Sequence, residues 1–208
     1  MSKFKIVINW KKILLFFIVV RVLYLITTNL NHPDDYLISD FPLIQQPDSI
    51  SCGPTSCAMI LSFYKKDIKV EECKILTKTT WFRYQGKEIG MTTPEYIREC
   101  LNSNKLNYSL AIGSISGIKA RVSKNKPVIV LLRSGEYTWH YVVVIGYDKN
   151  NLILADPGYG KKEIISNENF IRCWSFKGDM SGKDFSNDSN LLSFLLKLAE
   201  VNPYTMVY

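Results

Sequence analysis

The chain has few histidines and no two cysteines spaced as C-x-x-C, and these absences limit its chemistry. Only two of its 208 residues are histidine, and its cysteines are odd in number and irregularly spaced: Cys52, Cys57, Cys73, Cys100 and Cys173. Structural zinc sites need four Cys or His ligands at short spacings, and disulfide-stapled domains need a denser, even set of cysteines. We therefore expect no metal site and no disulfide framework, with most of the thiols buried in a core.

The sequence also lacks the usual signatures of two classes of binding partner. There is no G-x-x-x-x-G-K-[ST] phosphate loop, so we expect no ATP. The net charge of +7 would suit nucleic acid, but five basic residues precede the first acidic one, Asp34, and the rest of the chain has 21 basic against 19 acidic residues. No cluster of Lys and Arg is interleaved with aromatic residues. We therefore expect no nucleic acid and no cofactor.

No uninterrupted apolar run in the chain reaches bilayer length. Residues 13–28 are apolar or weakly polar except for Arg21, and they follow Lys11 and Lys12. A spanning helix needs about 20 residues. No small-x-small cleavage pattern follows the run, and the lysines predict an N-terminus on the cytoplasmic side. We predict that residues 1–28 are a single-pass signal anchor with the domain on the extracytoplasmic side; a cleaved signal with a secreted domain and an interfacial helix are the alternatives.

The remaining chain divides into a polar linker (29–40), a domain (41–178) and a C-terminal extension (179–208) with one helix, at about 191–199. Within the domain, caps and apolar periodicity predict helices first, at 52–66, 70–77, 93–101 and 116–123. Apolar, β-branched runs then predict strands at 128–132, 141–145, 152–155 and, at an edge, 162–165, before a short helix at 167–174. This order predicts an α+β fold in which N-terminal helices pack on an antiparallel sheet.

The most informative segment runs from Gln45 to Cys57 and reads QQPDSISCGPTSC. Cys52 lies between a turn-rich stretch and an apolar helical run. If Gly53-Pro54 opens the helix, its first N–H groups and the positive end of its dipole favour a thiolate. Gln46, six residues upstream, can bring a side-chain amide to a developing oxyanion. The segment predicts a cysteine nucleophile, whereas Cys57, about 140° further round the helix, is expected to be structural.

A base for this thiol can be assigned by elimination. His32 falls in the predicted linker, whereas His140 begins an apolar strand. Asp156 ends the next strand after a turn at 148–151, so the two side chains fall at the open end of one hairpin. Taken singly, a structural histidine and a plain Asp-Pro-Gly turn are the commoner interpretations. With Cys52 they fit a Cys-His-Asp triad.

Three blocks of the sequence resemble the peptidase C39 and C39-like families: Gln46-x5-Cys52-Gly53-Pro54, residues 139–148 and residues 154–160. These are papain-like cysteine peptidases, best known for removing double-glycine leader peptides from bacteriocins. The resemblance covers about residues 41–174 and implies a papain-like fold. It also implies the role of each site residue: Cys52 as nucleophile, His140 as base, Asp156 as its orienting partner and Gln46 as oxyanion donor, with Gln45 a weaker alternative.

The best-characterised relatives are N-terminal domains of peptide-exporting ABC transporters, and this chain lacks their phosphate loop and six-helix membrane domain. We therefore expect a stand-alone cysteine peptidase that acts on a peptide or protein substrate and is tethered to a membrane or exported. Two alternatives remain. One is a papain-like acyltransferase or transpeptidase, which shares the acyl-enzyme step. The other is a non-catalytic binding module that keeps the fold.

Overall fold

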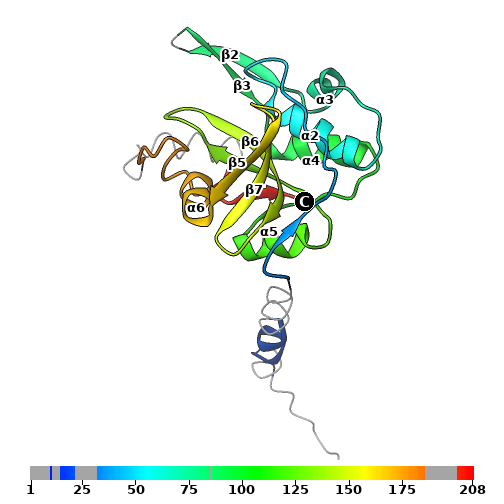
Figure 1. Cartoon of the computed structure of the whole chain (residues 1–208), viewed down its shortest axis with the longest axis vertical. Helices are drawn as coiled ribbons and strands as arrows, with labels where there is room; N and C mark the ends of the chain where they lie inside the picture. Colours follow the sequence, from blue (N-terminus) through cyan, green and yellow to red (C-terminus); the bar gives the residue numbers. More distant parts are fainter. Residues whose placement is uncertain (1–9, 11–14, 22–31, 85, 186–200) are drawn as a thin grey trace, which may run out of the picture.

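The computed structural model describes residues 10, 15–21, 32–84, 86–185 and 201–208 (Figure 1). The predicted anchor, residues 1–28, falls largely outside this part of the chain; Trp10 and residues 15–21 are described as helical, with exposed apolar side chains from Leu15 to Val20. Among the described residues, no helix combines the length and the apolar content needed to cross a bilayer. The helix predicted at 191–199 also lies outside the described residues.

An antiparallel sheet of seven strands forms the centre of the domain. Its order is β4-β9-β5-β6-β7-β8, and β1 pairs with β6 off this path. The strands are β1 (Tyr36–Leu37), β4 (Leu110–Ile112), β5 (Val128–Arg133), β6 (Trp139–Tyr147), β7 (Asn151–Asp156), β8 (Lys161–Ser166) and β9 (Thr205–Val207). Every pairing in it is antiparallel. The predicted strands are confirmed, including β8 at the edge.

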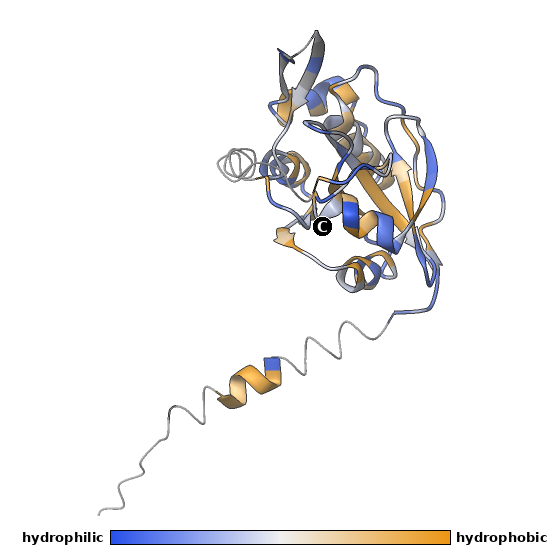
Figure 2. Ribbon diagram, turned by 90° about the vertical axis from the view of Figure 1, so that its left-hand side faces the viewer, coloured by the Kyte–Doolittle hydropathy of each residue, from blue (hydrophilic) through white to orange (hydrophobic). Residues whose placement is uncertain are grey.

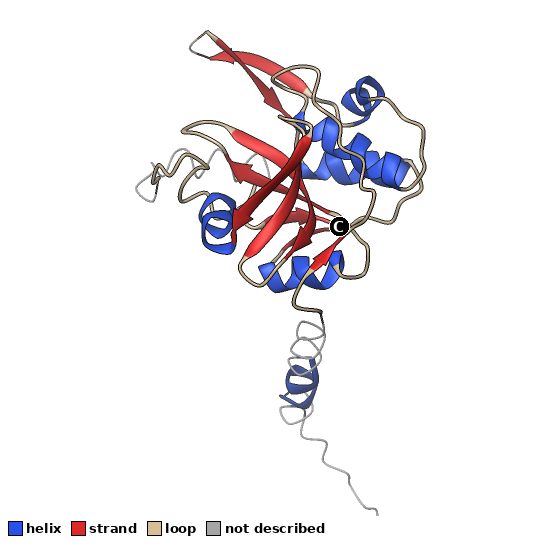
Figure 3. Cartoon of the chain, viewed as in Figure 1, coloured by secondary structure: helices blue, strands red, loops and turns tan. Residues whose placement is uncertain are grey.

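In the part of the chain that the structure describes, five helices pack around this sheet: α2 (Cys52–Phe63), α3 (Val70–Leu76), α4 (Pro94–Ser103), α5 (Ile115–Val122) and α6 (Asn167–Trp174). The first three pack against one another and α2 packs on β6, whereas α6 packs on β5, β7 and β8 (Figure 3). Thr93 caps α4 as predicted, because its hydroxyl accepts from the Tyr96 N–H. The start predicted at Ser116 is wrong: Ser114 is the N-cap, and its hydroxyl accepts from the Gly117 N–H at 3.0 Å.

Several elements were not predicted. A second, two-stranded sheet joins β2 (Thr80–Tyr84) to β3 (Lys87–Met91). Strand β9 comes from the predicted C-terminal extension and inserts between β4 and β5. The predicted linker contributes β1, whose residues pair with Tyr147 and Gly146. The domain therefore gathers strands from both of its predicted flanks.

The core lies where α2 meets the central strands. Residues Gly53 to Leu61 of α2 are all buried, as is every residue of β5. Strand β6 is buried from Tyr141 to Tyr147, and only its first two residues, Trp139 and His140, are partly exposed. Figure 2 shows apolar residues along strands of the sheet and a mixture of apolar and hydrophilic residues on the helices. The opening in this packing therefore coincides with the start of β6 and the start of α2.

Candidate active site

Cys52 is the first residue of α2 and is partly exposed. The N-cap, Ser51, makes no side-chain hydrogen bond to the helix; its hydroxyl instead donates to Asp48 Oδ1 at 2.6 Å. The first N–H groups of a helix have no partner within the helix. Without a side-chain cap, the N–H groups of Cys52 and Gly53 stay available to an anion at this end of the helix.

His140 and Asp156 form a close pair beside this helix start. His140 Nε2 lies 2.7 Å from Asp156 Oδ1, and the same oxygen accepts from the Gly158 N–H at 2.7 Å. Burial lowers the pKa of His140, but the Asp156 carboxylate and the neighbouring Cys52 outweigh it and raise the pKa to about 10. Since Nε2 faces Asp156, Nδ1 is the ring nitrogen left for the thiol. The structure thus brings three of the predicted site residues together.

A β-bulge in β6 lies between this pair and the hairpin turn. The register between β6 and β7 shifts between Val144 and Gly146, so that Ile145 is an extra residue with no partner in β7. Its carbonyl instead accepts from the Ile38 N–H at 2.8 Å, just beyond β1. The bulge is therefore supported by the segment that the sequence predicted to be a linker.

The bulge decides which face of the sheet the site residues share. On the side of the bulge away from the hairpin turn, Val143 lies opposite Ala155. By alternation, Asp156 then points to the same face as His140. Without the extra residue, Asp156 would lie opposite Val143 and point to the other face, because a one-residue change in register reverses every side chain. Sequence counting placed both residues at the open end of the hairpin but could not assign their faces.

Gln46 lies in the loop that leads to Cys52. Its backbone N–H donates to Pro157 O at 2.8 Å, which ties the loop to the turn after Asp156. Its side-chain Nε2 donates to Asp48 O at 2.6 Å, and Oε1 is buried with no partner in the described structure. Gln45 is exposed and packs against Gly160, which has a positive φ of 61°. Of the two glutamines, Gln46 is thus the one whose amide is partly buried.

A cavity of about 410 Å³ adjoins Cys52 and His140. Its walls come from the β2–β3 hairpin, the Thr92–Thr93 segment and the β5–β6 connection, with Glu88, Met91, Tyr137 and Trp139 among the lining residues. Gly90 of β3 lies against Ile50, where an added Cβ would come within 2.6 Å. Sequence reasoning missed this wall, although the aromatic and β-branched run Thr80–Tyr84 followed by Gly86 (φ 75°) is a hairpin signal.

The remaining histidine and cysteines lie away from the cavity. The ring of His32 packs edge-on against Tyr147, 5.5 Å between centroids, at the far end of β6 and roughly 20 Å from His140 by strand rise. The other four cysteines are buried and free: Cys57, Cys73, Cys100 and Cys173. Within the described residues, no group of three or more His, Cys, Asp or Glu is arranged to hold a metal ion.

Comparisons with known proteins identify the family and the fold. Residues 38–181 match the Peptidase_C39 like family. The peptidase domain of Streptococcus ComA, a bifunctional ABC transporter involved in a quorum-sensing pathway, superposes with a TM-score of 0.50 at 26% identity, over 62% of this chain and 89% of that domain. A Bacillus anthracis protein described as a C39-like peptidase gives a TM-score of 0.59 at 16% identity, over 85% of this chain and 98% of its own.

A relative in sequence is an uncharacterized protein of Methanothermobacter thermautotrophicus. It is 29% identical over 140 residues, which cover 62% of this chain and 83% of that protein. The likeness to the Bacillus protein concerns the fold alone, since identity is low. The family match spans the loop before Cys52, both strands of the His140–Asp156 pair and α6.

Proposed function

The chain belongs to the Peptidase_C39 like family, and from this premise we propose that it is a cysteine peptidase in which Cys52, His140 and Asp156 act as a triad. The observation that carries the proposal is the His140 ring, which pairs with Asp156 at 2.7 Å and shares the wall of one cavity with Cys52. This is the arrangement in which a histidine removes a thiol proton and later returns it to a leaving group.

The chemistry follows from the charges of this pair. The raised pKa of His140, about 10, means that the ring holds a proton at neutral pH. In the proposed mechanism this proton comes from the Cys52 thiol. The thiolate adds to the peptide carbonyl, and the resulting oxyanion faces the uncapped N–H groups at the start of α2. Imidazolium gives its proton to the departing amine as the C–N bond breaks. Water, deprotonated by the neutral imidazole, then hydrolyses the thioester and frees the thiol.

Gln46 is proposed as the second oxyanion donor. An amide nitrogen carries two protons, and the contact with Asp48 O uses one of them. The second proton is free to donate to the oxyanion without breaking that contact. A Gln46→Ala variant is therefore expected to lose about 10²-fold in kcat, as for one donor of an oxyanion hole.

The decisive experiment measures the reactivity of individual thiols. Iodoacetamide at pH 6–7 should alkylate Cys52 well before the other cysteines in the native protein, and His140→Ala should abolish that preference. Cys173 is a matched control because it is buried and distant from His140 in sequence. Equal labelling of Cys52 and Cys173 would contradict the proposal. Hydrolysis of a peptide library then identifies substrates, and a product that changes on addition of amines would indicate acyl transfer.

We further propose that residues 1–28 tether the domain to a membrane, with the domain outside the cytoplasm. The support is the sequence alone: Lys11 and Lys12 precede the apolar run, the orientation signal for an N-terminus inside. The full chain should sediment with membranes and resist extraction by alkaline carbonate, while a chain that starts at residue 29 should not. Equal solubility of the two chains would rule the tether out.

A further inference from the structure

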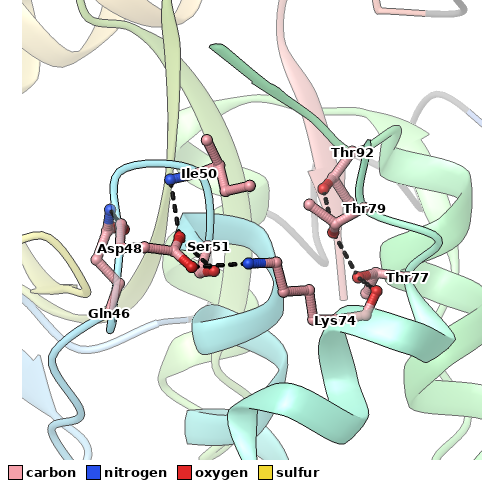
Figure 4. Close-up of polar contacts among 8 residues, drawn as sticks. All are labelled: Gln46, Asp48, Ile50, Ser51, Lys74, Thr77, Thr79 and Thr92. Carbon is pink, nitrogen blue, oxygen red and sulfur yellow. Dashed lines mark hydrogen bonds and ion pairs between the residues drawn. The ribbon is translucent and has the colours of Figure 1, made fainter. Parts of the chain in front are cut away.

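Asp48 is the centre of the loop between the proposed oxyanion donor and the proposed nucleophile (Figure 4). Its carbonyl accepts from Gln46 Nε2 at 2.6 Å. Its Oδ1 accepts from the Ile50 N–H at 3.0 Å and from the Ser51 hydroxyl at 2.6 Å. Its Oδ2 pairs with Lys74 Nζ of α3 at 2.7 Å. One residue thus contacts the loop on both sides and a neighbouring helix.

The Ser51 contact has a particular consequence for the helix start. Serine at an N-cap ordinarily turns its hydroxyl onto an N–H of the first turn, and Ser51 does not. Pro54 has no N–H, so Gly53 would be the natural partner of such a cap. Because Asp48 Oδ1 holds the hydroxyl, the N–H groups of the first turn remain open toward the position where an oxyanion would form.

The ion pair with Lys74 is the weaker part of this arrangement. Side-chain exposure is 31% for Lys74 and 41% for Asp48, and exposed pairs contribute little to stability. The ion pair instead fixes the orientation of the Asp48 carboxylate: with Oδ2 bound to Lys74 of α3, Oδ1 is turned toward Ile50 and Ser51.

A chain of threonine hydroxyls links the same helix to the cavity. Figure 4 shows that it runs from Thr77, just after α3, through Thr79 to Thr92 of the cavity wall, with oxygen–oxygen distances of 2.8 and 2.6 Å.

We propose that Asp48 is a positioning residue of the active site: it withholds the Ser51 hydroxyl from α2 and orients the Gln46 amide, so that both oxyanion donors are ready before substrate arrives. This inference rests on the proposed peptidase activity. It predicts an effect on transition-state stabilisation rather than on substrate binding, because the oxyanion exists only after attack.

The test compares four variants in peptide hydrolysis. Asp48→Ala should lower kcat about tenfold with KM changed less than twofold, since interactions made only in the transition state affect kcat. In Asp48→Ala/Ser51→Ala the hydroxyl can no longer cap Gly53, so kcat should recover at least about threefold over Asp48→Ala. Asp48→Asn keeps an acceptor for Ser51 and should retain at least about a third of kcat. Glu99→Ala, which removes a carboxylate from the exposed pair with Lys78, is the matched control and should leave kcat unchanged.

Three outcomes would overturn the positioning role: an unchanged kcat in Asp48→Ala, no recovery in the double variant, or a loss in Asp48→Asn as large as in Asp48→Ala. A merely structural role would give no recovery, because the double variant removes further contacts. Thermal melts verify that each variant folds. If Asp48→Ala does not fold, the kcat of Asp48→Asn alone tests the positioning role. Failure of the peptidase proposal is separate: it appears in the wild type as unselective alkylation of Cys52 and no hydrolysis.

Discussion

Cys52 and Cys57 lie five residues apart on the same helix, yet the structure gives them opposite environments. Cys52 is partly exposed at the first position of α2 and lines the same cavity as His140. Cys57 is fully buried, its Sγ lies 3.9 Å from Ile97 O, and burial raises the pKa of its thiol. We therefore expect thiol reactivity in this chain to depend on position along and around α2, not on residue type.

The largest expected difference between the two thiols is in activity. Cys52→Ala should lower kcat by at least about 10⁴-fold, as for loss of a nucleophile from a triad. Cys57→Ala should keep wild-type kcat and lower the free energy of unfolding by about 1 kcal/mol, through a small cavity. Peptide hydrolysis and denaturant unfolding measure the two effects. A Cys57 variant that is inactive but fully folded would contradict the structural role of Cys57.

The second effect concerns the group that orients His140. Asp156→Asn should lower kcat about 10²-fold, within the range for general acid–base catalysis. It should also reduce the ratio of alkylation rates between Cys52 and Cys57, because the imidazolium beside Cys52 loses its carboxylate partner. Iodoacetamide labelling followed by mass spectrometry gives that ratio. An unchanged ratio would mean that Asp156 does not act through His140.

A smaller effect is expected from the bulge that aligns His140 with Asp156. A Cβ at Gly146 would lie 2.8 Å from Tyr36 O and 2.9 Å from Leu37 Cδ1. Gly146→Ala should therefore destabilise the domain by about 1–3 kcal/mol, as overpacking does. It should lower kcat several-fold, because β1 supports the bulge, and leave Cys57 unreactive. Full stability in this variant would show that β1 does not hold the register.

The last prediction concerns the pH dependence of stability, which does not depend on catalytic activity. The folded-state pKa of His140 is raised from 6.5 to about 10, so its contribution to folding is fully present below about pH 6.5 and is lost as the pH rises toward 10. Urea unfolding between pH 6 and pH 10 should show stability decreasing in this window. The decrease should be smaller in His140→Ala and unchanged in His32→Ala. Identical slopes in all three proteins would contradict the raised pKa.

The helices and central strands could be predicted because their signals are local. Thr93 and Pro94 mark the start of α4 within two residues, and the run from Val128 to Leu132 reads as a buried strand. The missed elements depend on distant partners. Strand β9 has only three residues and is defined by pairing with β4 and β5, which lie more than 70 residues earlier.

The sequence by itself determined the candidate nucleophile, the candidate base and an α+β fold, because a helix start beside Cys52 and an apolar strand after His140 are read from adjacent residues. Only the tertiary structure decided that His140 and Asp156 share a face, since that depends on one extra residue in β6 and on the β1 segment that supports it. It also decided that the Ser51 hydroxyl binds Asp48 and leaves α2 uncapped. Side-chain direction in a sheet reverses with each residue, so register must be fixed by contacts that a single segment does not contain.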